Sequence, residues 1–209
     1  MPEPIDLILR EWIAPLLKAN GFKKNARRSW VRDDGDGNLA YVTIVGSDTS
    51  DWAAYRFFFE VGITPASRQR YLNDVDPDSK HNIHSCWWTR LTPPEPVEDG
   101  VDHFSRWVCD NHDVDGQALT GRVMRKTLEV WIPKLLELST PANMLAYLEQ
   151  NEPLTPGYQA WVGPAGAHAD LFLLLDAGPS ERLDRAIAGV QGDRWVREWL
   201  DQQSGRTGT

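Results

Sequence analysis

The sequence is poor in cysteine, has no long apolar run and carries no excess of positive charge. Two cysteines in 209 residues are too few for a framework of disulfides. No apolar stretch approaches the roughly 20 residues that a membrane-spanning helix needs. The N-terminus places acidic residues before its first apolar run and lacks the basic region of a signal peptide. We therefore expect a cytoplasmic protein that does not enter the membrane.

The charge also limits the partners of the chain. Its net charge of −8 disfavours nucleic acid, because phosphate binding needs a basic field. Residues 1–32 nevertheless carry seven Lys or Arg against three Asp or Glu, whereas the rest of the chain carries fifteen against twenty-seven. A local basic patch around Lys23, Lys24, Arg27 and Arg28 is one interpretation, and a solvated helix end next to an edge strand is the other.

The motifs of the common enzyme classes are absent. The chain has no G-x-S-x-G, Walker loop, H-E-x-x-H or dinucleotide fingerprint. We predict no cofactor and favour a protein without catalytic activity. The remaining enzymatic alternative is an acid–base pair of His84 with Glu60 or Asp110 across the sheet.

Two short stretches have the residue types of a split zinc site, HNIHSC at 81–86 and CDNH at 109–112. Side chains alternate between the two faces of a strand. With Trp87 and Trp107 on buried faces, Cys86 points away from the core and Cys109 points into it. Four ligands then cannot converge at about 2.0–2.3 Å, so we predict neither a metal site nor a disulfide between these cysteines.

The apolar spacing predicts an α+β fold. A first helix presents one apolar face and is kinked by Pro15 before Asn20-Gly21 ends it; that face comprises Ile5, Leu9, Trp12, Ile13 and Leu16. Alternation of period two then predicts strands at 28–33, 39–46, 54–63, 83–91 and 105–110.

The second half of the chain is predicted to be helical. The apolar spacing predicts helices at 116–138 (interrupted by Pro133), 141–150, 165–176, 180–190 and 193–203. We expect an α+β domain over residues 1–150, made of an N-terminal helix and a four- to five-stranded antiparallel sheet that leads into the helical C-terminal half. A helical extension follows over residues 151–209, and its last residues are predicted to be disordered.

The order of several short stretches resembles a known bacterial family. LLKANGFKKNARRSWVR leads into a hairpin and FFFEVGI, and CWWTRL, RWVCDNHDVDG and WIPKLLEL follow. This order resembles the uncharacterised bacterial family catalogued as domain of unknown function 4304, over roughly residues 5–150. The resemblance implies an α+β domain without agreed catalytic residues. Some small bacterial families of this kind neutralise toxins or bind partners, which is an analogy at the level of the fold.

Strand parity also predicts a candidate binding surface. The face opposite the predicted core carries aromatic and arginine side chains, a composition that interface hot spots favour. Parity assigns His84, Trp88, Arg90, Arg56 and Phe58 to it, with Glu60 on the same face of its strand. Trp30 is added as a candidate because Arg28 and Arg32 lie two residues from it on either side. We predict a non-enzymatic binding protein whose partner is another protein. The alternative function is a hydrolase-like or nucleic-acid-associated activity on the same face. In the alternative structure, the helical tail covers this face and buries Trp88.

Overall fold

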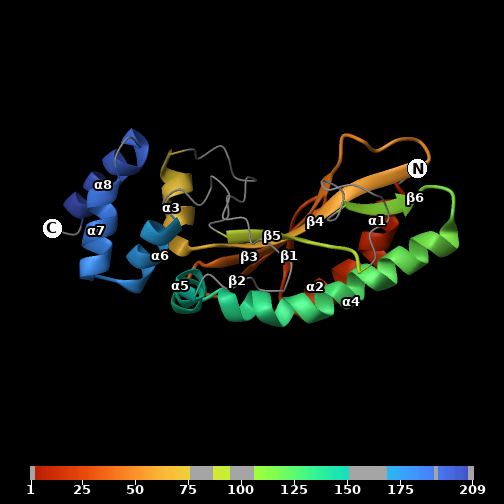
Figure 1. Ribbon diagram of the computed structural model, residues 1–209, viewed down its shortest axis with the longest axis horizontal. Helices are drawn as coiled ribbons and strands as arrows, with labels where there is room; N and C mark the ends of the chain where they lie inside the picture. The colour runs from red at the N-terminus through yellow and green to blue at the C-terminus, as the bar shows by residue number, and fades with distance from the viewer. Residues whose placement is uncertain (1–2, 76–86, 95–105, 151–168, 191–192, 207–209) are drawn as a thin grey trace. The chain divides into compact units, whose positions relative to one another are not determined.

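The computed structural model describes residues 3–75, 87–94, 106–150, 169–190 and 193–206. In these residues the strands lie between the N-terminal helical segment and the helical C-terminal half, with one helix among them, and they form one sheet (Figure 1). The predicted α+β class, with an N-terminal helix, an antiparallel sheet and a helical C-terminal half, is therefore confirmed.

The N-terminal helical segment contains a wide turn that the sequence pattern did not predict. Its parts are α1 (Pro4–Ile8), the π-helical turn η1 (Leu9–Ile13) and α2 (Ala14–Ala19). In an α-helix, Pro15 would lack its backbone donor and its ring would clash with the carbonyl four residues earlier. The π turn, in which the amide of Ala14 bonds to the carbonyl of Leu9, widens the helix just before the proline.

This wide turn also changes which side chain faces the core. A regular helix predicted Leu16 at the end of the apolar face, whereas the structure buries Leu17 and leaves Leu16 partly exposed. The π turn takes up one extra residue, so the buried position moves one residue along the chain. Gly21 then ends the segment as predicted, with a φ of 82° that favours glycine.

The described residues contain six strands, one more than the upper number predicted. They are β1 (Lys23–Ala26), β2 (Ser29–Asp33), β3 (Leu39–Gly46), β4 (Ala54–Thr64), β5 (Trp87–Leu91) and β6 (Arg106–Asp110). The extra strand is β1, which pairs antiparallel with β2 through Lys23 opposite Val31 and Lys24 opposite Trp30. Its sequence, KKNA, has no apolar alternation because it is an edge strand whose lysines are exposed.

The order of the sheet is β1-β2-β3-β4-β5, and β6 also pairs with β4. Strand β6 runs antiparallel to the first half of β4, from Ala54 opposite Asp110 to Phe58 opposite Arg106. Along β4 the predicted alternation is confirmed, since Phe57 and Phe59 are fully buried whereas Phe58 is partly exposed. The rows of side chains that alternate along β4 and β5 therefore define the candidate surface.

Six helices follow the first four strands in the described residues. They are α3 (Ala66–Val75), α4 (Val114–Leu138), α5 (Pro141–Gln150), α6 (Ala169–Ala177), α7 (Glu181–Gly189) and α8 (Arg194–Arg206). Pro133 does not interrupt α4 as predicted, because the helix continues through it to Leu138. Near its start α4 packs closely on the N-terminal helical segment, where Gly121 faces the indole of Trp12.

The chain forms two compact units, each made of several chain segments. The sheet unit comprises residues 1–33, 40–62 and 88–137, and the helical unit comprises 34–39, 63–87 and 138–209. The division predicted at residue 150 remains a prediction. Within the helical unit, α3 packs with the C-terminal helices α6 and α8, although it precedes them by about a hundred residues.

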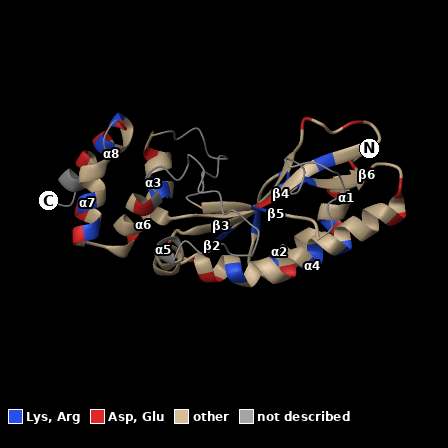
Figure 2. Ribbon diagram, in the orientation of Figure 1, with Lys and Arg blue, Asp and Glu red and all other residues tan. Residues whose placement is uncertain are grey.

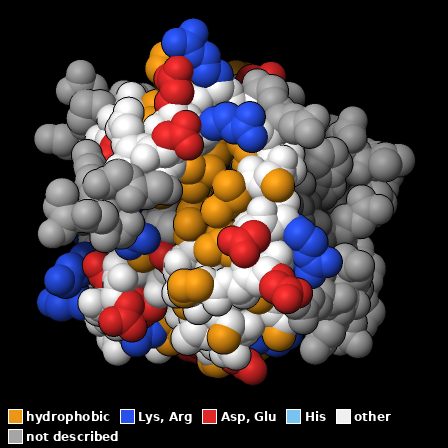
Figure 3. Space-filling view, turned by 90° about the vertical axis from the view of Figure 1, so that its left-hand side faces the viewer, with side chains coloured by type: hydrophobic (Ala, Val, Ile, Leu, Met, Phe, Trp, Pro, Cys, Tyr) orange, Lys and Arg blue, Asp and Glu red, His pale blue; other side chains and the backbone are white. Residues whose placement is uncertain are grey.

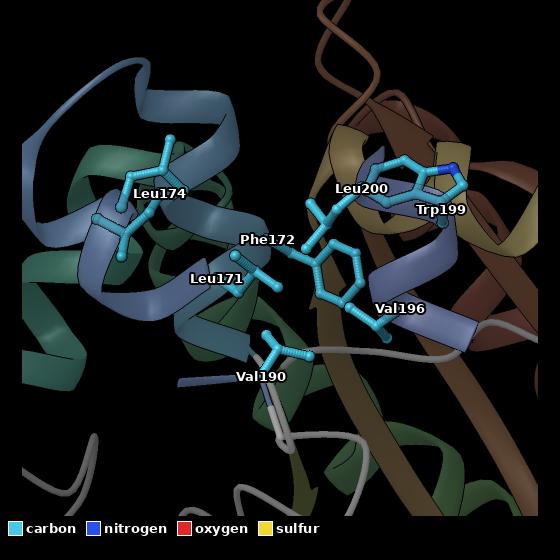
Figure 4. Close-up of a cluster of buried hydrophobic side chains, with 8 residues drawn as sticks. Leu171, Phe172, Leu174, Val190, Val196, Trp199 and Leu200 are labelled. Carbon is cyan, nitrogen blue, oxygen red and sulfur yellow. The ribbon is translucent and has the colours of Figure 1, made fainter. Parts of the chain in front are cut away.

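The helical unit has its own apolar core. Phe172 lies at the centre of the cluster, with Leu171 beside it and Val196, Trp199 and Leu200 contributed by α8 (Figure 4). Partly buried apolar side chains pack against the outside of the cluster. Figure 3, which faces the left-hand side of Figure 1, shows apolar side chains between charged ones.

One carboxylate holds α3 and α6 together within this unit. Asp176 accepts the backbone N–H of Ser67 at 3.1 and 3.0 Å and the guanidinium of Arg70 at 3.1 Å. The hydroxyl of Ser67 in turn donates to the carbonyl of Phe172 at 2.6 Å. The amide of Ser67 at the start of α3 is thus satisfied by α6, and that of Ala66 by the side chain of Asn38, rather than by a residue just before the helix.

Candidate functional site

The predicted surface on β4 and β5 is centred on Arg90. The guanidinium carbon of Arg90 lies 3.8 Å from the centre of the Phe58 ring and 5.5 Å from that of Trp88. All three side chains are partly exposed, and they come from two neighbouring strands of the sheet. The structure therefore brings together three of the predicted residues. We call Phe58, Trp88 and Arg90, together with Glu60, the arginine–aromatic face.

Glu60 fixes the orientation of this arginine. Its Oε1 accepts the Nε–H of Arg90 at 2.9 Å, and the side chain of Glu60 is only 14% exposed whereas that of Arg90 is 36% exposed. A planar guanidinium held by a carboxylate and stacked on a ring loses little further side-chain entropy when it binds a partner.

Two other predicted residues do not join this face. The guanidinium of Arg56 turns to the loop before β4, where it donates to the Thr49 carbonyl at 3.1 Å and to Asp51 at 2.9 Å. Trp30 is only 4% exposed, so its expected place among exposed residues is wrong. With Leu9 and Ala14 it lines a pocket of about 310 Å³, because the N-terminal helical segment packs on this part of β2.

Two more residues considered in the sequence analysis, His84 and Cys86, lie outside the described residues. The same holds for the other positions of the HNIHSC stretch. Cys109 points into the core as strand parity predicted, and it is fully buried. Burial raises the pKa of the Cys109 thiol to about 11, and the nearby charge of Asp110 makes a smaller contribution in the same direction. The thiol is therefore protonated and unreactive at neutral pH.

The basic residues near the N-terminus are largely used within the sheet unit. Arg27 donates to Asp6 at 2.6 Å, and Arg28 donates to Asp6 at 3.0 Å and also bonds to Glu3 and to the Tyr55 hydroxyl. Burial acts to raise the pKa of Asp6, but hydrogen bonds from Arg28 and Arg27 outweigh it and hold that pKa below its usual value. Two of the four cations of the predicted basic patch are thus paired internally.

Sequence reasoning missed one contact and one exposed side chain. Glu60 was assigned to the correct face, but its ion pair with Arg90 depends on the register between β4 and β5, which the sequence does not specify. Trp52 lies in the loop between β3 and β4 and is 81% exposed. The only available signal was a tryptophan within the polar stretch SDTSDW.

None of the helices in the described ranges is long and apolar enough to cross a membrane. Comparison with protein-family profiles, with curated proteins and with solved structures found no match.

Proposed function

We propose that this protein is a non-enzymatic binding protein that engages another protein through the arginine–aromatic face. The observation that carries the proposal is the stacking of Arg90 over Phe58 and beside Trp88, with the Arg90 side chain still 36% exposed. Tryptophan and arginine dominate binding hot spots because each combines a large contact area with directional donors. A location in the cytoplasm and membership of the family that the chain resembles are parts of the same proposal.

The enzymatic alternative has less support from the described residues. Glu60 is paired with Arg90, and Asp110 accepts the backbone N–H of His112 at 2.7 Å and of Asp113 at 3.1 Å. Both carboxylates proposed as partners of His84 therefore already have structural roles. A general base needs its lone pair directed at a substrate proton, so these contacts favour binding over catalysis.

The test combines capture of the partner with two substitutions. A photo-crosslinking amino acid at position 88 identifies the protein that contacts this face in cells, and the same group at Trp195, a 65% exposed residue of α8, controls for general stickiness. The affinity of the identified partner is then measured with Trp88→Ala and Trp195→Ala. We expect Trp88→Ala to weaken binding about 30-fold or more, corresponding to roughly 2 kcal/mol, and Trp195→Ala to leave it unchanged.

The stability of the same variants distinguishes a binding face from a covered one. A partly exposed Trp88 predicts a change in unfolding free energy below about 1 kcal/mol, whereas truncation of a buried tryptophan costs roughly 3–5 kcal/mol. A large loss of stability in Trp88→Ala, or equal crosslinking from positions 88 and 195, would contradict the proposal. Arg90→Lys keeps the charge but removes the planar stack, so we expect it to weaken binding as well.

A further inference from the structure

Trp52 is the most exposed large hydrophobic side chain in the described part of the sheet unit, at 81%. An indole is a large apolar group, and burial of such a side chain would contribute about 1.5–3 kcal/mol. Because Trp52 is exposed, the folded sheet unit does not gain this stabilisation. A single exposed apolar residue needs no explanation, so what matters is how Trp52 is held and what surrounds it.

The loop that carries Trp52 is fixed by its own hydrogen bonds. Asp51 Oδ1 accepts the N–H of Ala53 at 2.8 Å and of Ala54 at 2.9 Å. On the other side Arg56 bonds to Asp51 Oδ2 at 2.9 Å and to the carbonyl of Thr49 at 3.1 Å. The indole is therefore presented by a closed, hydrogen-bonded turn.

A second loop, from a distant part of the chain, locks onto the first. The side-chain amide of Asn111 donates to the carbonyls of Trp52 at 3.1 Å and Asp51 at 3.3 Å, and its backbone N–H donates to Ala53 at 2.8 Å. The ring of His112 lies 5.6 Å from that of Trp52. Because loop residues about 60 positions apart share these bonds, Trp52 loses little conformational freedom on binding.

The two loops carry charge of one sign. Segments 47–53 and 110–117 contain five aspartates and no Lys or Arg. They are Asp48, Asp51, Asp110, Asp113 and Asp115, all of them exposed. Figure 2 shows red segments in the loop between β3 and β4 and near the start of α4. An exposed indole in a negative field attracts cations, both through the face of its ring and through the surrounding carboxylates.

We propose that Trp52 and these aspartates form a docking site for a basic segment of a protein, with a Lys or Arg side chain stacked on the indole. The site is separate from the arginine–aromatic face and does not depend on its function. Nucleic acid is disfavoured because its charge has the same sign as the site. A bound metal ion is also disfavoured, because no group of three potential ligands converges among the described residues.

The test uses an acetylated and amidated hexa-arginine peptide, with hexa-glutamate as the control peptide. The indole N–H signal of Trp52 is assigned in the amide NMR spectrum as the one missing from Trp52→Phe. We expect hexa-arginine to shift this signal in the unsubstituted protein, with an affinity that falls as salt rises. Hexa-glutamate should leave the signal unchanged.

Three variants decide whether the site acts as proposed. Trp52→Ala should weaken hexa-arginine binding at least 10-fold without lowering the melting temperature, since the side chain is exposed, and Trp52→Phe should give an intermediate loss because a phenyl ring holds a cation less well. Asp48→Asn combined with Asp113→Asn should also weaken it. Trp195→Ala is the control, because that residue is exposed on another unit. Equal binding by Trp52→Ala and the unsubstituted protein, or binding of hexa-glutamate, would overturn the proposal.

Discussion

Replacement of Gly121 by alanine tests the close contact between α4 and the N-terminal helical segment. A Cβ built at Gly121 would lie 2.4 Å from Cδ1 and 2.8 Å from Cγ of Trp12. Carbon atoms in contact normally lie about 3.5–4.0 Å apart. The added methyl group therefore cannot be accommodated unless the indole or the helix moves by about 1 Å.

Two effects of opposite sign decide the magnitude. Alanine is favoured over glycine within a helix by about 1 kcal/mol, which would stabilise α4. Overpacking of a tight contact costs about 1–3 kcal/mol, and here the methyl group meets the ring itself and not the end of a flexible chain. The difference between the two effects predicts that Gly121→Ala lowers the free energy of unfolding by up to about 2 kcal/mol.

The assay is a comparison of four proteins: the unsubstituted chain, Gly121→Ala, Trp12→Ala and the double variant. Urea unfolding followed by far-ultraviolet circular dichroism gives their stabilities, and hydrogen exchange of peptides from α4 gives a local measure. In the Trp12→Ala background the clash is gone, so Gly121→Ala should become stabilising by up to about 1 kcal/mol. Gly189→Ala, whose Cβ would meet no atom within 4 Å, is the control. The same change in stability in both backgrounds would refute the reasoning.

Two further predictions concern carboxylates. Asp176→Ala should destabilise the helical unit by roughly 1–3 kcal/mol and speed hydrogen exchange in α3, because the buried N–H of Ser67 loses its acceptor. Asp170→Ala, at an exposed position of the same helix, should change neither, and equal effects would contradict this. The folded pKa of Asp6 is lowered, so its contribution to stability is present above the ordinary pKa of 3.8 and is lost as the pH falls through the folded value. Asp6→Asn should thus reduce the loss of stability between neutral pH and about pH 2 in urea titrations, and an unchanged pH profile would contradict this role.

The strands were predictable where alternation was strong. Along β4 the pattern of Phe57, Phe58 and Phe59 gave the correct buried and exposed faces, since a strand with one buried face can have only one parity. The edge strand β1 has no such pattern, and it forms because its backbone pairs with β2. Backbone pairing of an exposed edge strand needs no buried face, so it leaves no periodic signal in the sequence.

The candidate site was predictable in part for the same reason. Parity assigned Trp88 and Arg90 to one face, whereas Trp30 was included because two arginines lie near it in the sequence. Packing of the N-terminal helical segment buries Trp30, and this contact between distant segments has no local signature. The exposure of Trp52 likewise depends on hydrogen bonds from Asn111, which belongs to a loop some 60 positions later.

The segmented course of the two units has a consequence for synthesis on the ribosome. Each unit takes chain from three separate segments, and the sheet unit needs residues up to 137. Domains generally fold from the N-terminus as the chain emerges, but here the first 62 residues lack the β6 partner of β4 and the whole of α4. Strand β4 contains a run of three phenylalanines, and its edge that pairs with β6 therefore remains unpaired until β6 is translated. The nascent chain is expected to be most prone to aggregation in this interval. A ribosome-associated chaperone that binds residues 54–64 would protect it.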